Sequence, residues 1–276
     1  MNKKVWFLLG ALLVAAILVL FIPPVPQAQT YHNFADRRTF VGIPNCFDVI
    51  SNLFFLIAGA MGIAFVFRDI ARGGHAFIDT RERWPYLAFF VAIALTAFGS
   101  AYYHLHPNDS RLVWDRIPIT MGFMSLLAAV VAERVSVKAG LRLLAPLLIL
   151  GVGTVVYWSV TQANGHGDLR PYGFVQFGSM LAFLLLLVLF PARYTRGAGF
   201  VISFGFYALA KLLEVGDRWV FAHGRIVSGH TLKHIFAAVS SYWIFRMLAL
   251  RRPIAAPDSR RDEQETGVAA PVPHWP

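Results

Sequence analysis

Residues 84–104 read WPYLAFFVAIALTAFGSAYYH, an apolar run that ends in a serine and a histidine. About 20 apolar residues in a helix cross the hydrocarbon core of a membrane. Because the run contains no Asp, Glu, Lys or Arg, we expect a transmembrane helix from Trp84 to Tyr103. Ser100 and His104 stand four residues apart at its end, a spacing that puts both side chains on one face of a helix.

Apolar runs of similar length recur along the chain of 276 residues, which is 57% hydrophobic and 14% charged. Soluble domains carry about 25% charged residues, so the composition indicates an all-α, polytopic membrane protein. We expect eight spans, at residues 5–22, 47–67, 84–103, 114–132, 143–160, 172–190, 200–215 and 230–250.

The first run, residues 5–22, follows two lysines and could be a signal peptide, since a basic start and an apolar core are typical of one. It is longer than the usual core of 7–15 residues, and the prolines after it precede no convincing cleavage site. We therefore expect a retained helix. The expected divisions are residues 1–30 for this helix and its linker, 31–252 for the other membrane helices, and 253–276 for a disordered cytoplasmic tail.

The net charge of +10 does not indicate nucleic-acid binding, because the basic residues gather in short loops between spans and form no stripe interleaved with exposed aromatics. If both termini are cytoplasmic, 16 of the 25 Lys and Arg residues lie on the cytoplasmic side and 9 lie outside. That asymmetry supports this topology. The single cysteine, Cys46, excludes an internal disulfide and a cysteine-rich metal site.

A second polar pair, His230 and His234, opens the last expected span with the same four-residue spacing. In this topology Ser100, His104, Asp115 and the second pair all lie at the outer ends of their helices. Ionisable groups at membrane depth usually have partners, and clustered imidazoles are natural zinc ligands. The pattern predicts a catalytic zinc site whose metal ligands are His104, His230 and His234.

Asp115 begins the fourth expected span, where it could cap the helix or act as the general base that takes a proton from water. Ser100 could be a small packing residue, or its hydroxyl could steady the water or donate to an oxyanion. His106 is an alternative ligand to His104, although a residue two positions away points elsewhere on a helix. We expect Asp115 and Ser100 to be catalytic.

Lys211, Glu214 and Asp217 recur every three residues, which predicts ion pairs along one helix face at the rim of the site. A hydrogen bond donated by a ligand histidine to Asp217 is the alternative. His223 is expected in a loop, and four further histidines are expected to face solvent in loops or in the tail: His32, His75, His166 and His274.

Taken together, the serine, aspartate and histidines resemble the signature of the alkaline ceramidase family. That family belongs to a membrane-hydrolase superfamily that also contains the adiponectin and progestin receptors. The residues concerned are Ser100, His104, Asp115, His230 and His234. The resemblance covers about residues 45–250, including Asp48 to Asn52. It implies a seven-transmembrane-helix bundle, with residues 5–22 as one extra N-terminal transmembrane helix.

The resemblance also implies a function. The three histidines would bind Zn²⁺, Asp115 would activate the water and Ser100 would assist. The enzyme would be a metal-dependent amidohydrolase that cleaves a ceramide-like lipid to a fatty acid and a sphingoid base or similar amine. We expect its partners to be a membrane lipid substrate and the lipid bilayer, with no nucleic acid and no obligate protein partner.

Eukaryotic members of the family carry a calcium site formed by an acidic cluster and a glutamate near the first shared helix. The corresponding loop here offers Asn33 and Asp36, and Asn45 stands at the position of the glutamate. Calcium sites usually need several carboxylates, so a role for Ca²⁺ is doubtful. The loop resembles that of bacterial members, and we expect a protein of the bacterial inner membrane with its site toward the outer face.

Other functions fit the same residues. A lipid ester hydrolase or remodelling enzyme would use the same metal site. A receptor-like protein would hold zinc structurally, which usually takes four protein ligands, and the sequence offers three histidines and Asp115. A transporter fits less well, because paired mid-span Gly or Pro breaks are not obvious.

Overall fold

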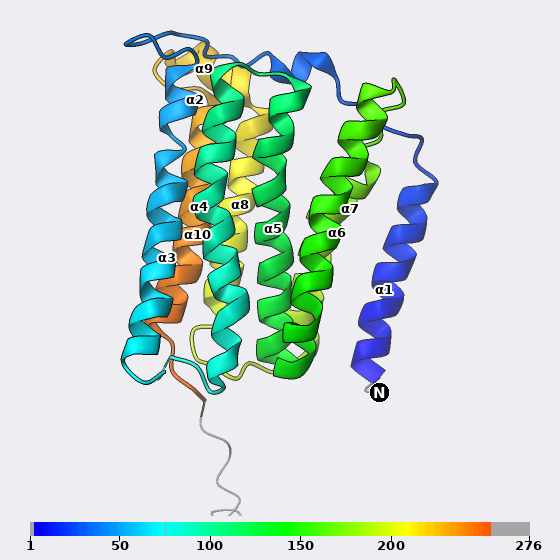
Figure 1. Cartoon of the computed structure of the whole chain (residues 1–276), viewed down its shortest axis with the longest axis vertical. Helices are drawn as coiled ribbons and strands as arrows, with labels where there is room; N and C mark the ends of the chain where they lie inside the picture. Colours follow the sequence, from blue (N-terminus) through cyan, green and yellow to red (C-terminus); the bar gives the residue numbers. More distant parts are fainter. Residues whose placement is uncertain (1–2, 75, 255–276) are drawn as a thin grey trace, which may run out of the picture.

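The structure, a computed structural model, describes residues 3–74 and 76–254, which form a bundle of long helices aligned along one axis (Figure 1). These residues contain α-helices and two short 3-10 turns, Gln29–His32 and Thr80–Glu82, and no strand. The α-helices are α1 Lys3–Leu20, α2 Cys46–Ile50, α3 Leu53–Ala71, α4 Arg83–Leu105, α5 Asp109–Arg134, α6 Val137–Ala163, α7 Arg170–Leu189, α8 Ala198–Val215, α9 Asp217–Gly224 and α10 Gly229–Leu250.

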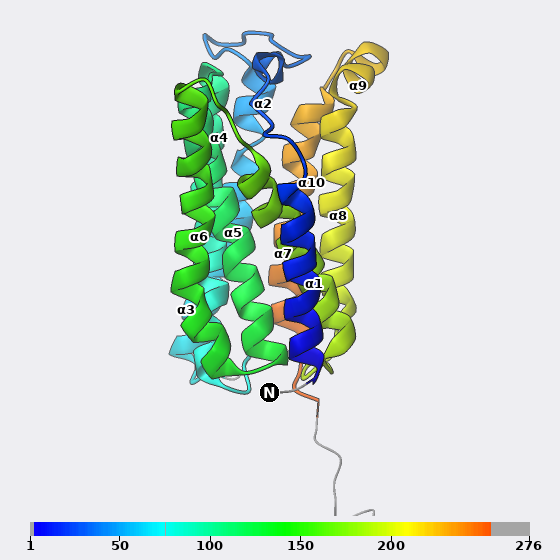
Figure 2. The ribbon, with the colours of Figure 1, turned by 90° about the vertical axis from the view of Figure 1, so that its right-hand side faces the viewer.

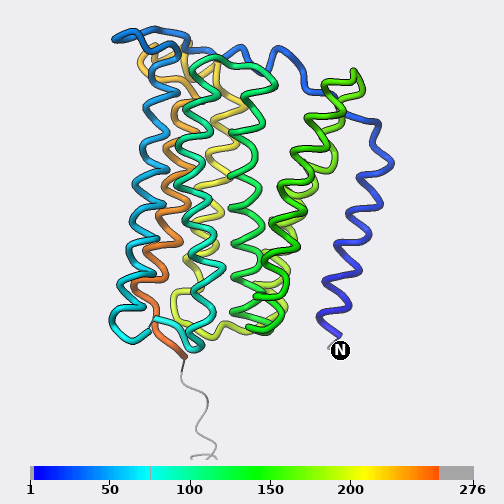
Figure 3. Tube along the Cα trace, in the orientation of Figure 1, coloured from blue at the N-terminus to red at the C-terminus, as the bar shows by residue number. Residues whose placement is uncertain are grey.

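Seven segments of the described chain are long and apolar enough to cross a membrane: α1, α2 with α3, α4, α5, α6, α7 and α8. This confirms the predicted all-α polytopic fold. The eighth expected span is α10, whose first turns carry His230, Lys233 and His234 and which is not among those seven. Its 22 residues still run along the bundle, against α3 and α8 (Figure 3).

The extra helix α1 lies at the margin of the bundle against α7, and only its Leu8 is buried (Figure 2). Most of its apolar side chains therefore face outward, as lipid contact requires. The linker after α1 crosses one end of the bundle, and both ends of the described chain lie at the opposite end (Figure 1). The disordered tail predicted for residues 253–276 lies outside the described residues from position 255 onward.

The second expected span is broken near its start, between α2 and α3. The Ser51 hydroxyl and the Asn52 amide both donate to the Asp48 carbonyl, at 3.1 and 2.7 Å. Side chains that bond to a nearby carbonyl compete with the backbone hydrogen bonds of a helix. The break leaves the Ser51 hydroxyl in contact with His234 on α10.

Two boundary predictions are wrong. The loop expected around Arg218 and His223 is largely helical and forms α9. Helix α5 begins at Asp109, five residues earlier than expected, because the Asn108 side chain accepts from the Arg111 backbone N–H at 2.9 Å and caps it. Asp115 consequently lies inside α5 and does not cap the helix.

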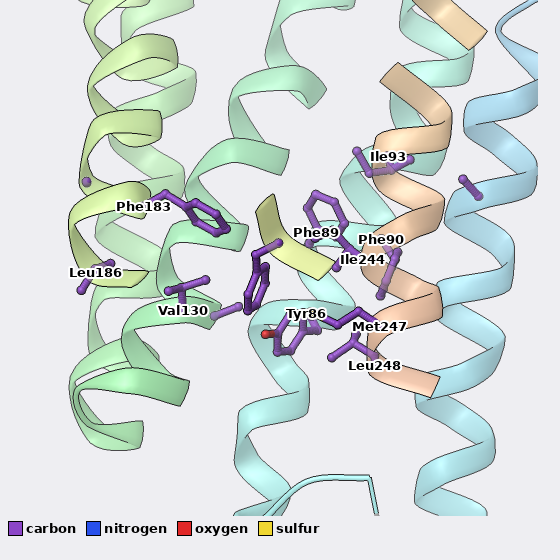
Figure 4. Packing of buried hydrophobic residues seen from close by; sticks show 14 of the residues in the cluster. Tyr86, Phe89, Phe90, Ile93, Val130, Phe183, Leu186, Ile244, Met247 and Leu248 are labelled. Carbon is purple, nitrogen blue, oxygen red and sulfur yellow. The ribbon is translucent and has the colours of Figure 1, made fainter. Parts of the chain in front are cut away.

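The half of the bundle away from the linker is filled by apolar side chains of α4, α5, α7 and α10 (Figure 4). Tyr86 and Phe90 on α4, Leu186 on α7 and Leu248 on α10 are buried there. The packing is close enough to require a glycine on α3, since a Cβ at Gly62 would lie 2.1 Å from the Phe90 ring. This core fixes the helices that carry the polar groups at the other end.

Buried ion pairs close the far end of the bundle. The Glu133 carboxylate accepts from Arg251 at 2.5 Å and from the Tyr86 hydroxyl at 2.8 Å. Glu82 accepts from Arg193 at 2.8 Å. Because Arg251 directly follows α10, its pair with Glu133 anchors the C-terminal end of the helix that carries two of the three histidines.

We expect Arg251→Ala to destabilise the protein by about 3–5 kcal/mol, because removing one partner of a buried ion pair leaves the other charge uncompensated. The measurement is thermal denaturation in detergent micelles, with Arg252→Ala as the control. Arg252 is exposed, and within residues 3–74 and 76–254 only its backbone forms hydrogen bonds, to the neighbouring loop. Equal denaturation midpoints for the two variants would contradict this expectation.

Candidate metal centre

His104, His230 and His234 converge at the linker end of the bundle, His104 from the last turn of α4 and the other two from the first turns of α10. Their ring nitrogens lie within 4.8 Å of one another, and this group could hold a metal ion. The Nε2 atoms of His104 and His230 are 3.3 Å apart. Two nitrogen ligands of one tetrahedral zinc lie roughly 3.3 Å apart, given Zn–N bonds of 2.0–2.1 Å. The spacing thus fits a metal.

The protonation of His234 also fits a metal ligand. Its Nδ1 lies 2.8 Å from the Ser51 hydroxyl. Since Ser51 donates its own proton to the Asp48 carbonyl, Nδ1 must donate to Ser51, which leaves a lone pair on Nε2. That Nε2 is buried and has no hydrogen-bond partner among the described residues. A buried nitrogen with a free lone pair, oriented by its other nitrogen, is typical of metal ligation.

The backbone around the other two histidines is held by polar side chains. The Asn45 amide donates to the His104 carbonyl at 2.8 Å. Asp217 accepts from the His230 backbone N–H and from the Ala35 backbone N–H, both at 2.8 Å. The hydrogen bond considered between Asp217 and a ligand histidine therefore goes to the backbone of His230 and not to its ring.

Two glycines allow the helices to approach at the site. A Cβ at Gly99 would lie 2.1 Å from the Trp114 carbonyl oxygen, and a Cβ at Gly229 would lie 2.3 Å from the Leu213 carbonyl oxygen. The first contact brings α4 against α5, and the second brings the start of α10 against the end of α8. A side chain at either position would separate elements that carry site residues.

Ser100 and Asp115 meet across the first of these contacts. Both are buried, and the Ser100 hydroxyl donates to the Asp115 carboxylate. Both also line a cavity that reaches His234. The arrangement places a carboxylate and a hydroxyl on the cavity wall near the histidines, as the spacing led us to expect.

That cavity, of about 260 Å³, extends from the histidine end into the apolar half of the bundle. Its lining at one end includes Ser100, Asp115 and His234, and at the other end Phe89 and Phe183. Ser100 and Phe89 are 11 residues apart on α4, so the lining runs for about 16 Å along the helix at 1.5 Å per residue. The cavity has the shape and polarity to hold a long apolar chain with a polar group beside the histidines.

A group of charges that the sequence only partly indicated lies at the polar end of the cavity. The predicted Lys211–Glu214 ion pair is present. Lys233 also binds Glu214, at 2.9 Å, and its Nζ lies 3.4 Å from the Nε2 atom of His230. The Tyr31 hydroxyl donates to Glu214 at 3.3 Å, and burial, followed by the Glu214 carboxylate, raises the pKa of this phenol.

The linker after α1 lies over the histidines. The Phe34 ring is buried, with its centroid 4.6 Å from that of His104 and 4.4 Å from that of His230. The expectation that His32 faces solvent is wrong, because its ring bonds the Tyr103 hydroxyl at 2.8 Å and Asp109 at 2.9 Å. A single phenylalanine in a polar linker gave no signal of this role.

The other histidines lie away from the cluster. His106 is exposed at the C-terminal end of α4, so it is not the alternative ligand. His166 and His223 are exposed as well. His75 and His274 lie outside the described residues.

The linker residues considered for calcium contact arginines. Both Asp36 oxygens accept from Arg38, at 2.8 and 2.7 Å, and the Asn33 oxygen accepts from Arg37 at 2.7 Å. Burial raises the pKa of Asp36, but the hydrogen bonds from Arg38 outweigh it and hold this pKa below its usual value. The doubt about Ca²⁺ stays a prediction.

We expect Ser51→Ala to weaken metal binding by about tenfold to 100-fold without removing a ligand, because such outer hydrogen bonds typically contribute that much to metal affinity. Competition with a chromophoric chelator measures the zinc affinity. Ser110→Ala serves as the control, since this exposed hydroxyl in the first turn of α5 donates to Asn108 and lies outside the histidine group. An unchanged affinity in Ser51→Ala would show that the hydroxyl does not orient His234.

Comparisons of the sequence with protein-family models and with curated proteins find no match, so the family resemblance depends on the site residues themselves.

Proposed function

We propose that the protein is a zinc-dependent intramembrane hydrolase that cleaves the amide bond of a ceramide-like lipid. The products would be a fatty acid and a sphingoid base or similar amine. One observation carries the proposal: a cluster of three buried imidazoles meets, through His234, a cavity that is polar at that end and apolar farther along. A long acyl chain fits the apolar part, which would bring the adjacent amide to the histidines.

The donor set favours zinc in a catalytic role. Imidazole nitrogens suit zinc among the common metals, and catalytic zinc sites typically have three protein ligands and one open position. Among the described residues, the group contains three histidines and no fourth His, Cys, Asp or Glu donor. A zinc ion held there supplies a Lewis acid and lowers the pKa of water toward 7.

The chain's own side chains would perform the proton transfers. Asp115 accepts a proton from the attacking water and returns it to the leaving amine nitrogen. Ser100 donates to Asp115 and so holds the carboxylate in position. Lys233, which adjoins both His230 and the cavity, adds positive charge where the carbonyl oxygen becomes negative. The Phe34 ring over the histidines limits access of bulk water.

The distribution of Lys and Arg supports a location for the protein and an orientation for its site. The excess of Lys and Arg expected on one side supports a bacterial inner-membrane protein with both termini in the cytoplasm. The described ends of the chain lie at the end of the bundle opposite the start of α10, which carries His230 and His234 (Figure 1), so this orientation would put the site toward the outer face.

The test is hydrolysis of long-chain amide and ester lipids, side by side, by the purified full-length protein, with bound zinc quantified. We expect amide hydrolysis that a chelator abolishes and added zinc restores. Preference for the ester would instead favour a lipid ester hydrolase. Full zinc occupancy without turnover of either class would favour a receptor-like protein with structural zinc.

A further inference from the structure

Arg116 is a buried cation on the cavity wall, and it forms no ion pair within the described part of the chain. Its Nη2 donates to the Gln27 side-chain oxygen at 2.5 Å. Its Nη1 is also buried but has no hydrogen-bond partner there. Leaving a buried charged donor unpaired is costly, so this nitrogen calls for an acceptor that the described residues do not provide.

Aromatic rings hold the guanidinium in place. Its central carbon lies 4.2 Å from the centre of the Trp158 ring and 4.7 Å from that of Tyr172. Contacts of this kind stabilise a cation without neutralising its charge. The guanidinium is therefore fixed and desolvated before a ligand arrives, which favours tight binding of an acceptor.

The charges of the cavity lining leave this cation unbalanced. Arg116, Lys211 and Lys233 face only two carboxylates, Asp115 and Glu214. Both lysines bind Glu214, and the proposed function assigns Asp115 to proton transfer. Three cations against two carboxylates leave one positive charge in excess, and Arg116 is the cation of the three without an ion pair among the described residues.

We propose that the amine half of the substrate carries a carboxylate that Arg116 binds, so that the substrates are N-acyl amino acids. The inference rests on the proposed function for the scissile amide. A guanidinium matches a carboxylate in geometry and charge. Asp115 and Arg116 both line the cavity. An acid attached one carbon from the amide nitrogen would therefore have its carboxylate at Arg116 while its amide lies in the same cavity as Asp115.

The reaction balances without a further reactant. The amide C–N bond breaks, and a new C–O bond forms between the acyl carbon and the water oxygen. The amine nitrogen takes the protons released by the water and by the new carboxylic acid. The products are a fatty carboxylate and a zwitterionic amino acid, and the substrate carboxylate is unchanged.

The experiment compares N-oleoylglycine with N-oleoylethanolamine, which has a hydroxyl in place of the acid, and with N-oleoylethanolamine phosphate. We expect wild type to have the highest kcat/KM for N-oleoylglycine. In Arg116→Gln the ratio of kcat/KM for N-oleoylglycine to that for N-oleoylethanolamine should fall about tenfold to 100-fold, the usual effect of one charge-assisted hydrogen bond. Arg116→Lys, which keeps the charge, should retain part of the ratio.

The matched control is Arg111→Gln, an arginine on the same helix that stacks on Tyr102 and does not line the cavity. Its substrate ratio should equal that of wild type. A wild-type preference for the neutral amide would overturn the inference, and so would an equal loss on both substrates in Arg116→Gln. A preference for the phosphate would identify phosphate as the bound anion and reject the carboxylate.

Binding without turnover separates this inference from the proposed function. Tryptophan fluorescence reports ligand near Arg116 because Trp158 stacks on it, with Trp158→Phe to subtract the other tryptophans. Tighter binding of N-oleoylglycine than of N-oleoylethanolamine, lost in Arg116→Gln, supports the carboxylate site even if no amide is cleaved. Hydrolysis of neutral amides with no such binding difference leaves the hydrolase intact and rejects the carboxylate site.

Discussion

His230→Ala is expected to lose bound zinc and all measurable lipid-amide hydrolysis. The substitution leaves two imidazoles, from His104 and His234, in a group that has three donors in the described chain. Outer hydrogen bonds alone change metal affinity by 10–100-fold, so losing a direct ligand should lower it by more than about 100-fold. Zinc per protein after dialysis, measured by atomic spectroscopy, and hydrolysis of a long-chain amide are the two readouts.

The control for this variant is His223→Ala, which removes an exposed histidine from α9. It should keep both zinc and activity. If His230→Ala held one zinc as tightly as wild type does, the cluster would not be the metal site. If zinc were lost while hydrolysis continued, the chemistry would lie elsewhere in the protein.

Asp115→Asn is expected to keep its zinc and lose most of its activity. The residue is outside the histidine group, and an amide of the same shape can still accept the Ser100 hydrogen bond. It cannot accept a proton, and loss of a general base typically lowers kcat by about 10²–10⁴-fold. Steady-state kinetics and zinc analysis on the same preparation measure the two effects.

Asp79→Asn is the matched control, since this aspartate lies just before α4 at the far end of the bundle and its side chain accepts hydrogen bonds from Arg81. It should leave zinc content and kcat unchanged. An active Asp115→Asn would mean that another group accepts the proton. Loss of zinc in Asp115→Asn would mean that this carboxylate supports the metal site and is not simply its base.

The histidine cluster could be predicted because its signal is local. Helical spacing of four residues and a common depth in the membrane define Ser100, His104, His230 and His234 without any tertiary information. The helices themselves follow from apolar runs of bilayer length. Helix starts are less predictable, because they depend on single hydrogen bonds such as that of Asn108, which moves the start of α5 upstream of Asp115.

Several residues that surround the histidines could not be predicted, because they come from chain segments with no periodic pattern. Phe34 and His32 belong to a polar linker, and only the folded chain lays that linker over the end of the bundle. Lys233 and Arg116 carried a usable signal, since a charged residue within a membrane helix usually has a functional partner. Identifying Glu214 as the partner of Lys233 required the packing of α10 against α8.

The division of the histidines along the chain has a consequence for biogenesis. His104 and His230 are 126 residues apart, and the four long helices α5, α6, α7 and α8 are synthesised between them. A ribosome-bound chain that has not yet inserted α10 presents one imidazole of the three. On the proposed function, metal uptake would follow insertion of the last described helix, and a bound zinc ion would report that the whole bundle is assembled.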